Sequence, residues 1–133
     1  MDLHFHHIGF LTSNIEKWER GSLFEMKIGD VLDPIQNARL CLYRNFSDSY
    51  TELIQPLNEQ AFTWNALMKN GNHFHHLCYQ VRSTQSLNDI VEKYRLIQIL
   101  KPVPALLFES KLVTFFYSRN KQIIEFLIAE NES

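Results

Sequence analysis

The sequence predicts an α+β fold of two tandem βαβββ modules with their helices on the outside, and two observations carry this prediction. First, the run His4–His7 (His-Phe-His-His) recurs as His73–His76, 69 positions later (73 − 4), and these two runs hold all six histidines. Second, each run begins the same order of elements, a strand, a helix and three strands, and the last strand of each set carries a glutamate within an apolar run. The pattern indicates an internal duplication.

The first module begins with a strand over Leu3–Leu11. Ser13-Asn14-Ile15-Glu16 has the spacing of a capping box, and it predicts a short helix that ends near Gly21 and buries Ile15 and Trp18. Turn-forming residues, Gly29-Asp30 and Asp33-Pro34 among them, separate the next apolar segments, and Pro56 ends the last one. We expect these segments to be strands at 24–28, 38–44 and 50–55.

A polar link with a helical turn at 62–68 ends in the turn signal Asn70-Gly71-Asn72. His73–Val81 then repeats the first strand, and Ser83 or Thr84 can cap a helix whose apolar residues share one face. Three further strands are expected, with breaks at Pro102-Val103-Pro104 and Ser118-Arg119-Asn120. Their ranges are 97–101, 112–117 and 122–128.

A chain of 133 residues is the size of one domain, 1–133, with module one at about 1–57, the link at about 58–72 and module two at about 73–133. The formal net charge of −2 and the lack of a basic run argue against nucleic acid as a partner. The apolar runs are too short to span a membrane, and the start does not resemble a signal peptide, so we expect a cytoplasmic protein. Cys41 and Cys78 are expected to be buried thiols.

The duplication also predicts a metal site. If the modules pack about a pseudo-twofold axis, the first and last strands of each module approach one cavity, where His7, Glu52, His76 and Glu125 converge. Imidazole and carboxylate ligands together suit a divalent ion such as Zn, Ni, Co, Fe or Mn. The other histidines face away: we expect His6 and His75 to be supporting residues, and His4 and His73 to be exposed or in loop contacts.

Four segments, 6–10, 52–57, 75–79 and 124–127, resemble in order and spacing the vicinal oxygen chelate superfamily, which includes the glyoxalases, bleomycin resistance proteins and dioxygenases. The resemblance, which extends to methylmalonyl-CoA epimerases and glyoxalase I, implies a cup-shaped, partly open eight-stranded sheet around a divalent metal, and a homodimer. By position it places the metal ligands on His7, Glu52, His76 and Glu125. It implies an isomerase, epimerase or lyase that acts on a small acyl thioester or hemithioacetal through a metal-stabilised enolate. Glu125 is then the candidate catalytic base, with Glu52 as the second choice.

The chain also departs from this pattern. Epimerases of the group are expected to carry a second acid/base carboxylate on the strand that corresponds to 38–43, which has none here, and the glycine-rich loop is replaced by 102–110. A non-catalytic binding or resistance-type module is therefore the alternative, and an iron dioxygenase fits less well because two carboxylates are present. Two further sets of residues remain open between a site role and a structural one: Arg39, Arg44 and Arg119 at strand ends, and Tyr43, Phe115 and Tyr117 within strands.

Overall fold

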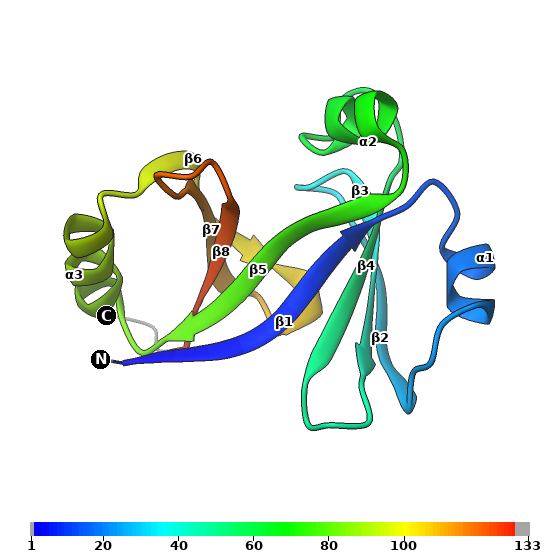
Figure 1. Ribbon diagram of the computed structural model, residues 1–133, viewed down its shortest axis with the longest axis horizontal. Helices are drawn as coiled ribbons and strands as arrows, with labels where there is room; N and C mark the ends of the chain where they lie inside the picture. Colours follow the sequence, from blue (N-terminus) through cyan, green and yellow to red (C-terminus); the bar gives the residue numbers. More distant parts are fainter. Residues whose placement is uncertain (1, 130–133) are drawn as a thin grey trace. The chain divides into compact units, whose positions relative to one another are not determined.

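The computed structural model describes residues 2–129, and the chain divides into two compact units (Figure 1). The N-unit comprises residues 7–75, and the C-unit comprises residues up to 6 together with those from 76 onward. The boundary falls inside each histidine run, between His6 and His7 and between His75 and His76. The first strand of each module therefore contributes residues to both units.

The N-unit is built on four strands that follow the expected order. They are joined in the order β2-β3-β4-β1, with β1 and β4 parallel and the other neighbours antiparallel. A short helix, α1, follows β1, and a second helix, α2, follows β4. The bounds are β1 Leu3–Leu11, α1 Ile15–Arg20, β2 Met26–Asp33, β3 Ala38–Arg44, β4 Tyr50–Pro56 and α2 Trp64–Asn70.

The C-unit repeats this plan. Its strands are joined in the order β5-β8-β7-β6, with β5 and β8 parallel and the other neighbours antiparallel. The bounds are β5 His73–Val81, α3 Thr84–Tyr94, β6 Ile97–Ala105, a 3-10 turn at Leu106–Phe108, β7 Lys111–Tyr117 and β8 Ile123–Ile128. In the hydrogen-bonded order of the eight-stranded sheet, β1 and β5 are neighbours. The α+β fold of two βαβββ modules is thus confirmed.

Side-chain caps fix where the helices begin. The Asn14 side chain accepts a hydrogen bond from the Lys17 N–H (3.0 Å), and Gln55 of β4 accepts one from the Ile15 N–H (2.8 Å). The expected capping role of Ser13 was therefore wrong by one residue. The cap predicted for the helix after β5 was correct: the Ser83 side chain accepts a hydrogen bond from the Ser86 N–H at the start of α3.

Each unit has its own apolar core on one face of its strands, beneath α1 in the N-unit and beneath α3 in the C-unit. In the N-unit, Ile15 of α1 packs with Cys41, Tyr43 and Leu53. In the C-unit the core consists of Val81, Leu87, Ile90, Phe116, Phe126 and Ile128. Both cysteines are buried thiols outside any disulfide, as predicted. Burial raises the pKa of the Cys41 thiol to about 11.

Two strands, β2 and β6, run several residues further than the sequence predicted, and both stand at ends of the strand order. The expected start of β2 at residue 24 was also wrong, because the strand begins at Met26. β2 passes through the expected turn at Gly29-Asp30, with a register shift between Lys27 and Gly29. β6 passes through Pro102 and Pro104, with a register shift between Leu100 and Val103. An edge strand hydrogen-bonds on one side alone, so it tolerates both the bulge and the missing proline N–H groups.

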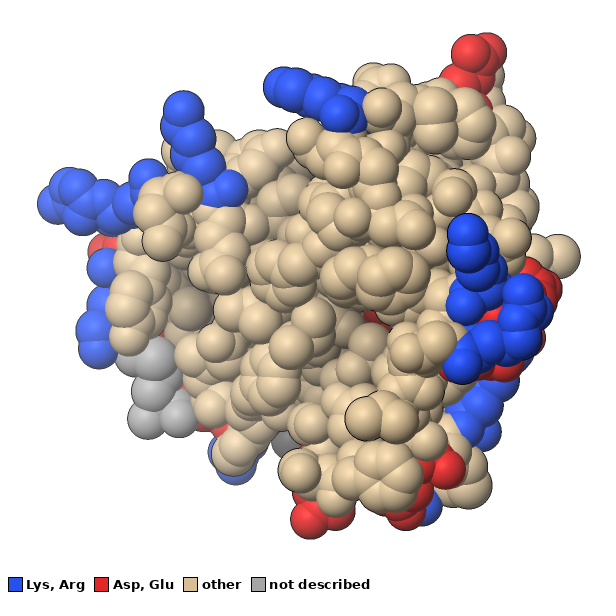
Figure 2. Space-filling model, turned by 45° about the vertical axis from the view of Figure 1, so that its right-hand side comes forward, with Lys and Arg blue, Asp and Glu red and all other residues tan. Residues whose placement is uncertain are grey.

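Charged side chains are scattered on the face drawn in Figure 2, where blue and red groups stand next to each other at the right-hand edge. No broad field of one sign covers that face, which agrees with the formal net charge of −2. Among residues 2–129, no helix has the length and apolar character needed to cross a bilayer; α3, with 11 residues, is the longest.

Candidate metal site

The N-unit carries a buried histidine–glutamate pair on two parallel neighbouring strands. The register places Gly9 of β1 opposite Glu52 of β4, and His7 lies two residues before Gly9 on the same face of β1. The Nε2 atom of His7 lies 3.5 Å from Oε1 of Glu52. The two side chains are 0% and 4% exposed, so the pair is removed from solvent.

The C-unit carries an equivalent pair at the same register. Cys78 of β5 lies opposite Glu125 of β8, and His76 precedes Cys78 by two residues, as His7 precedes Gly9. His76 Nε2 lies 3.1 Å from Glu125 Oε1, and these side chains are 1% and 2% exposed. The duplication seen in the sequence therefore reproduces the local geometry, and all four predicted ligand residues belong to such pairs.

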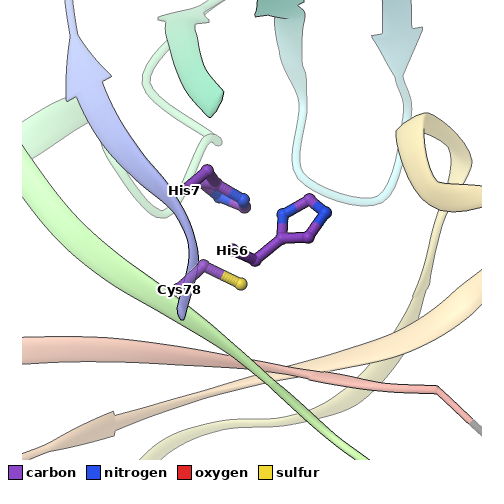
Figure 3. A group of neighbouring side chains, drawn as sticks. All are labelled: His6, His7 and Cys78. Atoms are coloured by element: carbon purple, nitrogen blue, oxygen red, sulfur yellow. The ribbon is translucent and has the colours of Figure 1, made fainter. Parts of the chain in front are cut away.

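The remaining histidines do not belong to these pairs. His6 of β1 packs edge-on against Phe108, with ring centroids 5.3 Å apart, and His75 packs in the same way against Phe62 (5.8 Å). Figure 3 shows His6 next to His7 along β1, and Cys78 on β5. The expected supporting role of His6 and His75 agrees with these contacts.

His4 and His73 lie at the outer ends of the two histidine runs. His4 is 79% exposed and lies 3.8 Å from Asp2, while His73 Nδ1 contacts the Gly71 carbonyl in the preceding turn at 2.7 Å. These are the surface and loop contacts expected of them.

The strand next to Glu52 presents apolar side chains to the same face. Leu42 of β3 lies opposite Glu52, and Leu40 lies opposite Ile54, and all of these residues are buried. Tyr43 has the other orientation: it belongs to the core beneath α1, where Phe24 stacks on it with ring centroids 4.1 Å apart. No carboxylate occurs on β3, as the sequence already indicated.

The corresponding position in the C-unit is aromatic. Phe115 of β7 lies opposite Glu125, and its ring meets the His76 imidazole edge-on at 5.3 Å. Phe115 is 1% exposed. It therefore restricts how the His76 ring can turn, which is a positioning role that the sequence alone left open.

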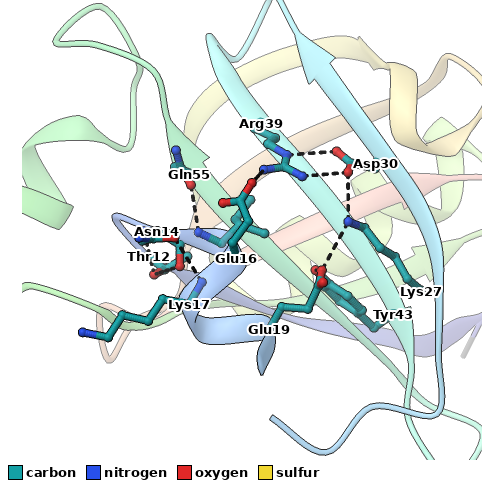
Figure 4. A network of polar contacts seen from close by, with 11 residues as sticks. Thr12, Asn14, Glu16, Lys17, Glu19, Lys27, Asp30, Arg39, Tyr43 and Gln55 are labelled. Carbon is teal, nitrogen blue, oxygen red and sulfur yellow. Dashed lines mark hydrogen bonds and ion pairs between the residues drawn. The ribbon is translucent and has the colours of Figure 1, made fainter. Parts of the chain in front are cut away.

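Arg39 is held in a network of charged residues (Figure 4). Leu42 lies opposite Glu52 and Arg39 opposite Gln55, so alternation along β3 places Arg39 on the face away from Glu52. Its guanidinium donates to Asp30 through two nitrogens (3.0 and 2.8 Å) and also contacts Glu16. Lys27 lies 2.9 Å from Asp30 and 3.2 Å from Glu19. Sequence reasoning missed this network, although its residues form a dense group of both signs between 16 and 39.

The network sets the ionisation of its members. The bidentate contact from Arg39 holds the pKa of the Asp30 carboxyl well below its usual range. The hydrogen bond from Tyr43 lowers the pKa of Glu19, and burial together with that bond raises the pKa of Tyr43. The network joins α1 to β2 and β3 and has a structural role.

The side chains of the two pairs fit a divalent cation. Histidine nitrogens and carboxylate oxygens are ligand atoms for such ions, and both are present within each unit. A carboxylate that is almost fully buried is costly unless a positive group lies beside it. A bound cation would supply that charge at Glu52 and at Glu125.

Comparison with known proteins adds family information. The family model described as Glyoxalase/Bleomycin resistance protein/Dioxygenase superfamily matches residues 6–103. No curated protein matches the chain.

Several solved structures are similar over nearly the whole chain, and three of them illustrate the range. A hypothetical protein from Bacillus halodurans C-125 is 23% identical (TM-score 0.83), covering 100% of this chain and 99% of that one. Methylmalonyl-CoA epimerase from Mycobacterium tuberculosis is 15% identical (TM-score 0.80), covering 96% and 89%. A further epimerase structure, in complex with methylmalonyl-CoA and NH4+, is 19% identical (TM-score 0.78), covering 100% and 99%. At these identities the likeness concerns the fold.

Proposed function

Because the chain belongs to the Glyoxalase/Bleomycin resistance protein/Dioxygenase superfamily, we propose that it is a metal-dependent isomerase, epimerase-like, that acts on a small acyl thioester. The observation that carries the proposal is the pair of buried His–Glu contacts at equivalent register in the two units. The fold likeness to methylmalonyl-CoA epimerases supports the choice of substrate class.

The proposal includes a single ion shared by both units. In it, His7 and Glu52 supply half of the ligands, and His76 and Glu125 supply the other half. The equal register supports this arrangement: if the two modules are related by a twofold axis, they present equivalent atoms to that axis. Two imidazoles and two carboxylates make a suitable ligand set for a borderline divalent ion.

In the proposed reaction, Glu125 accepts the proton from the carbon next to the thioester carbonyl. The planar carbon then turns its other face toward Glu125, which returns the proton there and so inverts the configuration. Glu52 is the second choice for this role. His76 orients Glu125 through their 3.1 Å contact, and Phe115 restricts the His76 ring. A bound divalent ion supplies Lewis acidity toward the carbonyl oxygen. Leu40 and Leu42 keep water from the Glu52 side.

One observation favours a second function, a binding module without chemistry. An epimerase that uses two bases needs a second carboxylate opposite the first. The residues of β3 that share the face of Glu52 carry none: they are Ala38, Leu40, Leu42 and Arg44. A protein of this kind would keep the metal ligands and bind an acyl compound without exchanging its proton.

The test combines metal analysis with proton exchange. We expect one divalent ion per chain in the purified protein, and we expect deuterium from D2O to enter the 2-position of methylmalonyl-CoA. Glu125→Gln should abolish exchange, and His4→Ala, at an exposed histidine, should not affect it. Full metal occupancy with no exchange into methylmalonyl-CoA, or into the hemithioacetal of methylglyoxal and glutathione, would exclude the enzyme and favour the binding module.

The same proposal places the protein in the cytoplasm as a homodimer. Light scattering of the purified chain at micromolar concentration should give twice the mass of 15.8 kDa. A monomeric mass would contradict the dimer and leave the metal site to be judged by the exchange experiment.

A further inference from the structure

The C-unit contains a cavity of about 530 Å³ on the face of its strands that carries α3. Its wall is mainly apolar, with Tyr79 of β5, Ile90 and Tyr94 of α3, and Phe126 of β8 among the lining residues. The size falls within the range of pockets that hold small organic molecules, about 300 to 1,000 Å³. Several lining side chains remain partly exposed, Tyr79 and Leu96 among them, although they pack against the core.

This cavity is distinct from the His–Glu pair of the same unit. Ile124 and Phe126 line it, and both are direct neighbours of Glu125 along β8. Because successive side chains of a strand point to opposite faces, Glu125 faces away from the cavity. The proposed catalytic residues therefore lie on the other face of the strand.

The two modules differ in the aromatic side chains that pack beneath the helix. In the N-unit, Trp18 of α1 stacks on Phe10 (4.6 Å), and the five-residue loop after α1 brings Phe24 onto Tyr43 (4.1 Å). In the C-unit, the loop between α3 and β6 has two residues, Arg95 and Leu96, and neither is aromatic. The N-unit still has hollows beside Trp18 and Phe24, but they are smaller, about 330 and 210 Å³.

The corresponding aromatic residues of the C-unit are arranged differently. Tyr79, three residues beyond His76 as Phe10 is beyond His7, packs edge-on against Phe5 (5.7 Å). Tyr94 of α3 is 47% exposed, and both tyrosines line the cavity. With Phe126, the cavity walls therefore offer three aromatic rings to an apolar group.

The rim carries one cation and polar groups. Arg119, in the turn between β7 and β8, is the one charged residue among those that line the cavity, and within residues 2–129 no ion pair engages it. Ser118 and Asn120 flank it, and the Ser118 hydroxyl donates to the Asn120 side-chain oxygen. The amide nitrogen of Asn120 is a donor, so guanidinium and amide together suit a carboxylate.

We propose that this cavity is a second binding site, for an organic acid with a medium-length aliphatic or aromatic body. The body lies among Tyr79, Ile90 and Phe126, and the carboxylate meets Arg119 at the rim. Burial of the apolar body supplies most of the binding free energy, and the guanidinium selects for the acid. The site is independent of the proposed metal chemistry.

The experiment uses titration calorimetry of the purified full chain with octanoate, with 1-octanol and acetate as comparators. We expect one saturable octanoate site per chain, weaker binding of octanol and no detectable binding of acetate. Arg119→Gln should weaken octanoate binding about tenfold or more, as expected for a hydrogen bond to a charged group, and should leave octanol unchanged. Lys101→Gln, which removes an exposed cation of β6 outside the cavity, is the matched control.

Two further variants decide where the ligand lies. Leu96→Trp should block octanoate and octanol alike by filling the cavity from its partly exposed side, with the circular dichroism spectrum and thermal unfolding as the check on folding. Glu125→Gln should leave octanoate binding unchanged. The proposal is overturned if wild-type protein shows no saturable site, if Lys101→Gln acts like Arg119→Gln, or if Glu125→Gln weakens binding instead. If no deuterium entered methylmalonyl-CoA in the exchange experiment, the expected octanoate results would be the same.

Discussion

Glutamine substitutions in the two units test whether one ion is shared. Glu125→Gln and Glu52→Gln keep the shape of the side chain and remove its charge, from the C-unit pair in one case and from the N-unit pair in the other. If all four residues hold the same ion, either substitution removes a ligand from that ion. If each pair binds its own ion, a single substitution leaves the other site intact.

The size of the effect follows from binding linkage. An ion present at 100 times its dissociation constant stabilises the folded chain by about 2.7 kcal/mol. For a chain of this length, a change of 1 kcal/mol shifts the melting temperature by about 4 °C, so saturating metal should raise it by about 10 °C. Each variant, with one carboxylate ligand lost, should show only a small part of that increase.

The assay is thermal unfolding followed by circular dichroism, with and without added Co or Zn after chelation. Wild type and His4→Ala should gain about 10 °C, with one ion bound per chain, and both glutamine variants should lose most of the gain. Two ions per chain, or a variant that keeps about half of the wild-type gain, would refute the shared site. A full gain in both variants would remove these carboxylates from metal binding altogether.

Three other predictions concern the structure around the site. The pKa values of Glu19 and Asp30 are lowered, so both carboxylates stabilise the folded state above about pH 4.5, and this stabilisation is lost as the pH falls further. In urea unfolding, the free energy of unfolding should therefore change less between pH 7 and pH 3 for Asp30→Asn than for wild type. Glu59→Gln, in an exposed loop, should behave as wild type. Ser83→Ala removes the cap of α3 and should cost about 1 kcal/mol in urea unfolding; no loss would refute the cap. Because burial raises its pKa to about 11, Cys41 should react with a disulfide reagent at pH 8 only after unfolding, and fast labelling in the folded state would contradict its burial.

The repeat in the sequence predicted the fold well because it marks both the first and the last strand of each module. Identical residue types at His7 and His76 marked the first strands, and the glutamates marked the last ones. Strands β1, β3 and β5 have the predicted bounds. The last two are apolar runs between clear turn signals. The errors fell on β2 and β6, where glycine and proline suggested breaks that edge strands can accommodate.

The candidate site could be predicted only in part. Residue type and alternation identified the two pairs, because a glutamate within an apolar strand requires a partner. The contact of Phe115 with His76, and the engagement of Arg39 by Asp30, depend on cross-strand register, which the sequence does not specify. The cavity behind Arg119 was also not predictable, since it arises from the length of one loop and the packing of the helix before it.

The boundary between His6 and His7 bears on how the chain acquires its structure. Residues 2–6 belong with the C-unit although they are made first, and residues 73–75 belong with the N-unit although they begin the second module. A polypeptide cut at Gly71 would therefore leave each fragment with a strand segment that belongs to the other. Neither fragment should be stable alone, and mixing the two should restore helical and strand signals together in one cooperative, concentration-dependent transition.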